Sequence, residues 1–417
     1  MLRFSSRKFF EKLSFSVRLT LNRLCSSGVV KYDNESQEVQ LVLDGGQVTC
    51  FPYEFLRDNC QCPLCFHETS GQSLTLLPDV LHDSDLGFRD ALFQDGRLAV
   101  KWNSGHESNF TLSWLQERSY STQRATQKGR HAIPGLQNIL WGAEKKDTMQ
   151  LFEFQDVINN DRKLFEWMRA ISTEGISLFK NAPKKPGQLK ALAKRGFGDL
   201  FKTMYGETFT VKEKPGANNL AYTSGYLALH TDQPYYIYQP GVQFLHCISG
   251  SAKNEAVNIL VDGFKVAEDL RKEKPEDFEA LTTLAFPYEQ PGDDIYGEFI
   301  IAADKTPIGI NERGEIVRIS HNYPSRAQYM NYPSQETRRL YRATGVFLER
   351  MYDPKYLFEY QLEEGDILAF HNTRVLHGRT PYDATRSSRW LEGGYGNWDD
   401  LYARMRALKI KMDKDNS

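Results

Sequence analysis

Two residues in the segment "LALHTDQPYYIY", His230 and Asp232, have the types and the spacing to hold a metal ion. Residues i and i+2 of a β-strand point to the same face, so both side chains can reach one cation. The strand-like segment "GDILAFHNTRVLHGR" offers a further histidine, His371 or His377. Two histidines and one carboxylate leave three positions of an octahedron open, which is the ligand arrangement of non-haem Fe(II) oxygenases. A single histidine is more often a structural residue than a metal ligand. The prediction of an iron site therefore rests on the two histidines and the aspartate taken together.

An arginine pair follows the second histidine in the segment "RTPYDATRSSRW", at Arg386 and Arg389. A guanidinium group about a dozen residues past the distal histidine can pair, through two hydrogen bonds, with the far carboxylate of 2-oxoglutarate.

Three cysteines, Cys60, Cys62 and Cys65 in "LRDNCQCPLCFHE", indicate a second metal centre. Zinc prefers four nitrogen or sulfur ligands in a tetrahedron, and the fourth ligand could be His67 or the more distant His106. We favour His106, because structural zinc sites commonly clamp separate segments and His67 would strain the turn. Three reduced cysteines without metal and an iron–sulfur cluster are the alternatives. A site with four protein ligands has no open position, so this zinc would be structural.

Composition limits the classes of protein that the chain can represent. Its 417 residues are 40% hydrophobic and 25% charged, which is ordinary for a globular protein with two domains. A net charge of -2 gives no reason to expect a nucleic-acid partner. No apolar run of about 20 residues predicts a transmembrane span. Six cysteines, three of them clustered, fit a reducing compartment better than a disulfide framework.

Periodicity predicts a small β-rich, zinc-binding domain at residues 29–130 and a larger domain at residues 131–417. A polar, basic stretch at 121–135 is predicted to link them. In the larger domain we expect helices at 161–172, capped by Asp161, at 188–198, and at 275–284, with Pro275 in its first turn. Gly175 is expected to begin a strand. Further strand-like segments lie at 241–248, 256–264, 315–323, 365–379 and 389–396. A few helices beside many non-repeating strands predict an α+β barrel or sandwich.

The first 28 residues carry six basic side chains and one acidic side chain, with several serines. This acid-poor, amphipathic pattern is typical of a mitochondrial presequence, and a poorly packed extension is the alternative. We therefore expect the mitochondrial matrix as the location, with the cytoplasm as the alternative.

Six segments, taken in order, resemble the gamma-butyrobetaine dioxygenase family of 2-oxoglutarate-dependent oxygenases. They are "LRDNCQCPLC", "GANNLAYTSGYLALHTDQP", "PGVQFLHCI", "VDGF", "LHGR" and "SRWLEGGY". The resemblance extends from about Tyr53 to the C-terminal "RMRALKIK". Trimethyllysine dioxygenases are similar in layout but lack the "ANN-AYT" segment, which favours the butyrobetaine branch.

The resemblance implies a double-stranded β-helix (jelly-roll) fold, with Fe(II) held by His230, Asp232 and His377. Arg389 would bind the co-substrate 2-oxoglutarate. The implied reaction consumes O2, converts 2-oxoglutarate to succinate and CO2, and hydroxylates gamma-butyrobetaine at C3 to L-carnitine, the last step of carnitine biosynthesis. Ascorbate as reductant and a homodimer are also implied.

The resemblance further implies a pocket for a small quaternary amine. A trimethylammonium group has no N–H to donate, so aromatic faces bind it by cation–π attraction. The positions that match the family's pocket are Tyr205, Phe209, Tyr222 and Tyr395 for the cation, and Asn219 and Asn322 for the carboxylate end. The alternative for each aromatic residue is ordinary packing in the core.

Three positions depart from the family's pattern. Phe209 stands where Trp is expected, which weakens cation–π attraction. Gln233 stands where Tyr follows the metal aspartate. His371 stands where Asp precedes "N-x-R", so His371 is expected either to support the metal ligands from outside or to be structural. The first two departures keep two alternatives open: hydroxylation of N6-trimethyllysine or another quaternary amine, and a catalytically silent metal-binding protein on the same fold.

Overall fold

The structure is a computed structural model that describes residues 28–33, 35–43, 48–81, 86–118, 136–212, 223–383 and 389–415. Four sequence predictions lie outside these residues: positions 1–27 of the presequence, the linker, the pocket residues Asn219 and Tyr222, and Arg386. The chain divides into two compact units, residues 1–132 and 133–417. None of the helices in the described ranges is both long and apolar enough to cross a membrane.

The N-terminal unit contains two antiparallel three-stranded sheets that enclose one apolar core. The strands of the first sheet are β1 (Gly28–Asp33), β2 (Glu38–Leu43) and β3 (Val48–Pro52), and those of the second are β6 (Phe88–Gln94), β7 (Arg97–Trp102) and β8 (Glu107–Thr111). The short elements are α1 (Tyr53–Asp58), β4 (Phe66–His67), β5 (Gln72–Ser73), α2 (Leu77–Leu81) and α3 (Leu112–Glu117). The β-rich character expected for this unit is confirmed.

The larger unit contains two facing sheets, which form the double-stranded β-helix expected from the sequence. In spatial order the six-stranded sheet has β11 (Thr208–Val211), β22 (Trp390–Gly396), β13 (Val242–Ser249), β20 (Ile367–His371), β10 (Ile176–Lys180) and β9 (Leu151–Glu153). The four-stranded sheet has β12 (Leu227–His230), β21 (Val375–Arg379), β14 (Asn258–Asp262) and β19 (Leu357–Tyr360).

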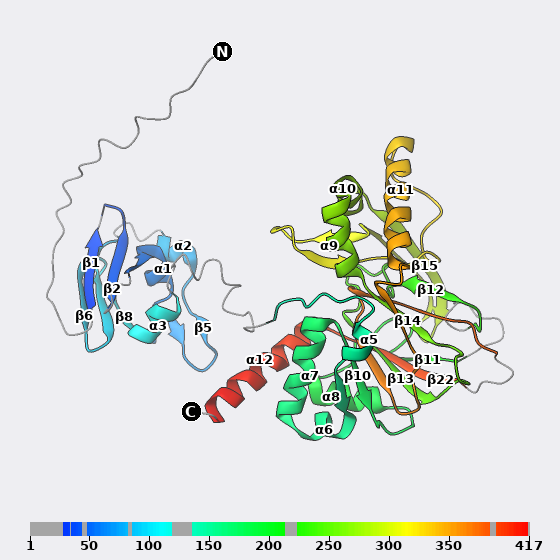
Figure 1. Cartoon of the computed structure of the whole chain (residues 1–417). Helices are drawn as coiled ribbons and strands as arrows, with labels where there is room; N and C mark the ends of the chain where they lie inside the picture. The colour runs from blue at the N-terminus through cyan, green and yellow to red at the C-terminus, as the bar shows by residue number, and fades with distance from the viewer. Residues whose placement is uncertain are drawn as a thin grey trace, which may run out of the picture. The chain divides into compact units, whose positions relative to one another are not determined.

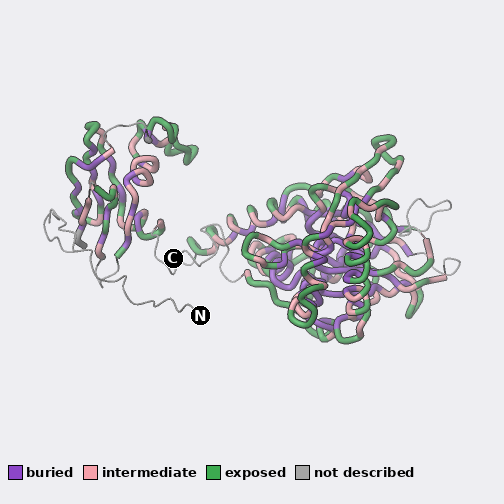
Figure 2. Tube along the Cα trace, turned by 90° about the horizontal axis from the view of Figure 1, so that it is seen from above, coloured by how far each residue is buried: buried purple, intermediate pink, exposed green. Residues whose placement is uncertain are grey.

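Three apolar layers follow from the alternation of side chains along these strands. On β13, Leu245 packs into the core between the sheets while its neighbour Phe244 packs outward against helices. On β14, Leu260 points inward and Ile259 and Val261 point outward. The strands therefore run through the buried middle of this unit, with exposed positions around it (Figure 2).

Helices cover the outer faces of the two sheets (Figure 1). Those on the six-stranded sheet are α6 (Phe154–Asn159), α7 (Asp161–Glu174), α8 (Gln188–Gly196) and α12 (Trp398–Asp415). Those on the four-stranded sheet are α9 (Gly263–Glu273), α10 (Pro275–Thr283) and α11 (Ser334–Met351). The remaining elements are α5 (Lys145–Thr148) and the hairpins β15 (Phe286–Asp294) with β16 (Gly297–Lys305), and β17 (Ile308–Ile310) with β18 (Ile316–Ile319).

Two predicted details at the ends of α7 are wrong. The N-cap is Asn160, whose side-chain oxygen accepts hydrogen bonds from the backbone N–H of Arg162 and Lys163. Asp161 instead forms an ion pair with Arg195. Gly175 ends the helix in the left-handed conformation (φ 72°) that glycine adopts readily, and β10 begins one residue later.

The segment 365–379, expected to be one strand, is two strands in different sheets. β20 ends at His371 and β21 begins at Val375, so the chain crosses from the six-stranded to the four-stranded sheet in three residues. The crossing residues Asn372, Thr373 and Arg374 are consecutive polar residues that interrupt the hydrophobic pattern, and the prediction of a single strand passed over this break.

A buried ion pair fixes this crossing. Arg374 donates two hydrogen bonds to Asp262, from Nε to Oδ1 (3.0 Å) and from Nη2 to Oδ2 (2.8 Å), and both side chains are fully buried. Its remaining donors reach the carbonyl oxygens of Thr173 (2.8 Å) and Ile139 (2.6 Å). Asp262 also caps α9 by accepting from the backbone N–H of Phe264. The pair thereby ties the crossing to α7, α9 and β14.

We predict that Asp262→Asn lowers the free energy of unfolding by about 3–5 kcal/mol, because it leaves a buried guanidinium without its counter-charge. Glu166→Ala, which breaks half-exposed pairs with Arg162 and Lys163, should cost less than about 1 kcal/mol. Urea denaturation followed by tryptophan fluorescence compares the two. Equal, small effects would contradict the role given to the Arg374 ion pair.

Candidate active site and metal centres

The first candidate metal centre lies where β12 pairs with β21. The antiparallel register sets His230 opposite His377, with ring centroids 4.2 Å apart. Asp232 follows in the turn after β12. The ligand atoms of these three residues lie within 4.8 Å of one another. The structure therefore brings together the three side chains that were predicted from the sequence to bind iron.

The donor geometry fits a six-coordinate cation. Nδ1 of His230 lies 2.8 Å from the carbonyl oxygen of Ala228, so this nitrogen donates and Nε2 carries the lone pair. That Nε2 lies 3.2 Å from Oδ1 of Asp232. Adjacent ligands at right angles around a cation, with bonds of about 2.1 Å, stand about 3 Å apart. The nitrogen of His230 and the oxygen of Asp232 match this separation, and His377 adds a second nitrogen within 4.8 Å of both. This donor set suits Fe(II).

The protonation states also suit metal binding. Burial, with a further contribution from His230, lowers the pKa of His377 to about 3, which keeps the imidazole neutral at neutral pH. Burial alone would raise the pKa of Asp232. Its contact with His230, the nearby His377 and the hydroxyl of Tyr395 outweigh burial and hold the pKa well below its usual range. A carboxylate and neutral imidazole are the forms that bind a cation.

The backbone of Asp232 is held by two side chains that sequence reasoning missed. Asn372 accepts from its N–H (2.8 Å) and donates to its carbonyl oxygen (3.0 Å), and Gln239 donates to the same oxygen (2.8 Å). Asn372 is fully buried at the crossing between β20 and β21. The only sequence signal was the "N-x-R" pattern beside His371.

His371 is not part of this centre. Its ring packs 4.6 Å from Trp398 and 5.9 Å from Phe264, and its Nδ1 lies 3.2 Å from the hydroxyl of Thr373. These contacts fit the structural role expected for it.

Two of the predicted pocket aromatics stack on each other, and one of them, Tyr395, contacts a metal ligand. Phe209 of β11 and Tyr395 of β22 have ring centroids 5.3 Å apart at 30°, and the Tyr395 hydroxyl donates to Oδ2 of Asp232 (2.7 Å). The ring of Phe209 lies over Gly393, where an added Cβ would come within 2.2 Å of it. Glycine at this position therefore makes room for the ring pair.

Tyr205 and Asn322 lie on other elements. The Tyr205 hydroxyl is 3.3 Å from that of Tyr235, and its ring meets Phe299 of β16 edge-on at 5.7 Å. Asn322 donates to the carbonyl oxygen of Thr231 at a long 3.4 Å. Asn322 thus contacts the backbone of Thr231, which lies between the metal ligands His230 and Asp232 in the sequence.

Arg389 lies at the start of β22 and is 7% exposed. Burial, and next the positive charge of Arg379, lower its pKa to about 10. Arg379 itself donates to the carbonyl oxygens of Thr223 (2.6 Å) and Gly225 (2.9 Å). Two buried guanidinium groups close to each other favour the binding of an anion. The guanidinium of Arg389 has the shape to donate two parallel hydrogen bonds to a carboxylate.

The second candidate metal centre joins two segments of the N-terminal unit. Nε2 of His106 lies 3.2, 3.7 and 3.6 Å from the sulfur atoms of Cys60, Cys62 and Cys65. A tetrahedral zinc site with Zn–S near 2.3 Å and Zn–N near 2.0 Å separates nitrogen from sulfur by about 3.5 Å. His67 is exposed and contacts Ser70 instead. The four side chains have the chemistry and spacing of a closed Cys3His zinc site.

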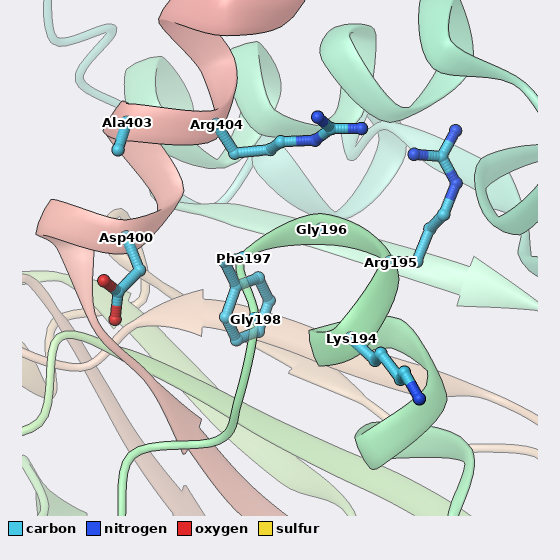
Figure 3. A pocket seen from close by; sticks show the side chains of 8 residues that line it. All are labelled: Lys194, Arg195, Gly196, Phe197, Gly198, Asp400, Ala403 and Arg404. Carbon is cyan, nitrogen blue, oxygen red and sulfur yellow. The ribbon is translucent and has the colours of Figure 1, made fainter. Parts of the chain in front are cut away.

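A surface cavity of about 540 Å³ lies between α8 and α12 of the larger unit (Figure 3). It is lined by Lys194, Arg195, Gly196, Phe197, Gly198, Asp400, Ala403 and Arg404. The guanidinium of Arg195 is occupied by Asp161 and by the carbonyl oxygen of Ile158. No candidate site residue lines this cavity.

Comparisons with known proteins agree with this geometry. The family model described as "Taurine catabolism dioxygenase TauD, TfdA family" matches residues 132–395, and "Gamma-butyrobetaine hydroxylase-like, N-terminal" matches residues 30–82. The gamma-butyrobetaine dioxygenase of Homo sapiens is 33% identical over 91% of this chain and 96% of its own length. That of Pseudomonas sp. (strain AK-1) is 31% identical over 87% and 92%.

The trimethyllysine dioxygenase of Bos taurus is more distant, at 26% identity over 87% of this chain and 83% of its own. The similarity to the human gamma-butyrobetaine dioxygenase covers 91% of this chain and so extends over both units. The chain is therefore an enzyme of the TauD, TfdA dioxygenase family and belongs to its gamma-butyrobetaine dioxygenase group.

Proposed function

We propose that this enzyme hydroxylates gamma-butyrobetaine at C3 to give L-carnitine, with 2-oxoglutarate converted to succinate and CO2. The observation that carries the proposal is the stacked pair of Phe209 and Tyr395, in which the Tyr395 hydroxyl donates a hydrogen bond to the metal ligand Asp232. A trimethylammonium group on these rings leaves C3, which is two bonds from the nitrogen, close to the metal ligands.

Each predicted residue has a role in this proposal. His230, Asp232 and His377 hold Fe(II), which when bound supplies the oxygen chemistry that couples decarboxylation to hydroxylation. Arg389 binds the far carboxylate of 2-oxoglutarate. Tyr205 extends the aromatic wall, and Asn322, together with Asn219 and Tyr222 outside the described residues, completes the pocket.

A trimethyllysine substrate is the second candidate. The observations that favour it are Phe209, a weaker cation–π partner than Trp, and Gln233, a polar side chain that is 5% exposed beside Asp232. The lower identity to the trimethyllysine dioxygenases favours gamma-butyrobetaine. A catalytically silent protein is the least favoured candidate, because the ligand set and Arg389 are intact.

Four further features are part of the proposal. Cys60, Cys62, Cys65 and His106 hold a structural zinc ion. The basic, acid-poor residues 1–28 direct the protein to the mitochondrial matrix. Ascorbate serves as the reductant, and the protein works as a homodimer; both are carried over from the family resemblance.

The function is tested with purified protein, Fe(II), 2-oxoglutarate and either gamma-butyrobetaine or trimethyllysine. We expect succinate and L-carnitine to form together with the first compound. His230→Ala should show no turnover, because two remaining ligands hold the metal poorly. Hydroxylation of trimethyllysine alone would replace the first candidate by the second, and no turnover on either would favour the silent protein.

Arg389→Lys should raise the KM for 2-oxoglutarate by at least about tenfold, because an ammonium cannot form both charge-assisted hydrogen bonds of the guanidinium. Steady-state kinetics with 2-oxobutanoate, which lacks the far carboxylate, provides the control. The wild type and the variant should differ little with this co-substrate. An unchanged KM for 2-oxoglutarate would show that Arg389 does not bind it.

Cys62→Ser should abolish zinc binding and lower the melting temperature of the N-terminal unit, because a structural zinc ion contributes directly to folding. Cys50→Ser is the matched control, since Cys50 is a free thiol of β3 outside the cluster. Metal analysis by mass spectrometry and scanning calorimetry measure the two effects. Equal zinc content in the two variants would contradict the assigned site.

A further inference from the structure

We propose that the Tyr395 hydroxyl, itself held by Gln233, keeps one oxygen of Asp232 away from the metal and so preserves an open coordination position. The inference rests on the iron site of the proposed function and adds a positioning role to two residues. Tyr395 then has two separate tasks: its ring faces the substrate cation and its hydroxyl governs how Asp232 binds the metal.

The two carboxylate oxygens of Asp232 have different neighbours. Oδ1 lies 3.2 Å from Nε2 of His230, on the side where the ligand atoms converge. Oδ2 accepts a short hydrogen bond, 2.7 Å, from the Tyr395 hydroxyl. An O–H···O bond of this length to an ionised carboxylate is a strong one. Only Oδ1 is therefore directed toward the metal.

The direction of this hydrogen bond follows from a count of donors. A carboxylate can only accept, so the single proton of the Tyr395 hydroxyl is given to Asp232. The hydroxyl oxygen can then only accept from its other neighbour, Nε2 of Gln233, at a long 3.4 Å. If the Gln233 amide were turned over, two acceptor oxygens would face each other. The network therefore fixes the orientation of the amide.

The backbone of Gln233 is adapted to this position. Its φ of 57° lies in the left-handed region, which costs a residue other than glycine of order 1 kcal/mol or more. The conformation turns the chain directly after Asp232, and Gln233 is 5% exposed. The strained backbone of Gln233 thus places its side-chain amide next to the Tyr395 hydroxyl.

The number of coordination positions shows what the hydroxyl achieves. Three protein ligands leave three positions of an octahedron. 2-Oxoglutarate needs two of them, and O2 needs the third. A carboxylate that bound through both oxygens would take one more position and leave none for O2. Because Tyr395 donates a hydrogen bond to Oδ2, Asp232 binds the metal through Oδ1 alone, as a monodentate ligand.

The test counts the water molecules on Mn(II) bound to the full-length protein, from line broadening by ¹⁷O-labelled water in electron paramagnetic resonance. Mn(II) replaces Fe(II) as the probe, and no substrate is added. The wild type should show three metal-bound waters. Tyr395→Phe keeps the ring but lacks the hydroxyl, and should show two. Gln233→Leu keeps the hydroxyl but removes its donor, and should give a mean count between these values.

Phe209→Leu is the matched control, because it removes the stacked ring without touching the hydrogen bonds of Asp232, and it should retain three waters. Turnover should fall by about 10–100-fold in Tyr395→Phe, as is usual when a partner that orients a metal ligand is lost. Three waters in both the wild type and Tyr395→Phe would overturn the positioning role alone. Failure of the wild type to bind Mn(II) would overturn the metal site itself.

Discussion

The antiparallel pairing of β12 with β21 is the contact on which the rest of the catalytic unit depends. It sets His230 opposite His377, and a slip of one residue would turn one imidazole to the outer face of the sheet. β21 is paired on its other edge with β14, and its entry is fixed by the ion pair of Arg374 with Asp262. Since β12 has only four residues, its register depends on this rigid neighbour rather than on its own length.

The polar groups of the site occupy the space between two sheets, where an unpaired charge is expensive. Asp232 remains ionised in this space because its oxygens face His230 and Tyr395, and its backbone stays in place because Asn372 holds both its N–H and its carbonyl oxygen. The three side chains reach Asp232 from three different strands or turns. The carboxylate is therefore positioned by the fold as a whole, and a cation that binds there meets a geometry already formed.

The sequence predicted the parts of the site that chemistry restricts to few residue types. Metal ligands come from few residue types, here His, Asp and Cys, so His230, Asp232, His377 and the cysteine cluster were recognisable. The double-stranded β-helix and the family came from the resemblance of the six segments quoted above. Asn372, Gln239 and Arg374 were missed because an amide or a guanidinium that holds a backbone has no periodic pattern. Asn372 and Arg374 also act across more than one hundred residues of sequence. The cap of α7 was misjudged because a side-chain hydrogen bond decides it, and hydrophobic spacing does not record that bond. The break within 365–379 is marked by the polar residues Asn372, Thr373 and Arg374, but the Arg374 contacts that turn them into a crossing are long-range.

The metal ligands and the pocket residues of the catalytic site differ in how freely they can be substituted. His230 and His377 lie on paired strands and Asp232 follows two residues after His230, so a change at any of the three disturbs the others. The pocket residues come from separate elements, β11, β22, the turn that carries Tyr205 and the segment after β18. Phe209 contacts Tyr395 and lies over Gly393, and no hydrogen bond joins its ring to Asp232. Under the proposed function, a change at Phe209 would alter which quaternary amine fits and leave the metal ligands untouched. Tyr395 contacts both Phe209 and Asp232, so a change there would also affect the metal site.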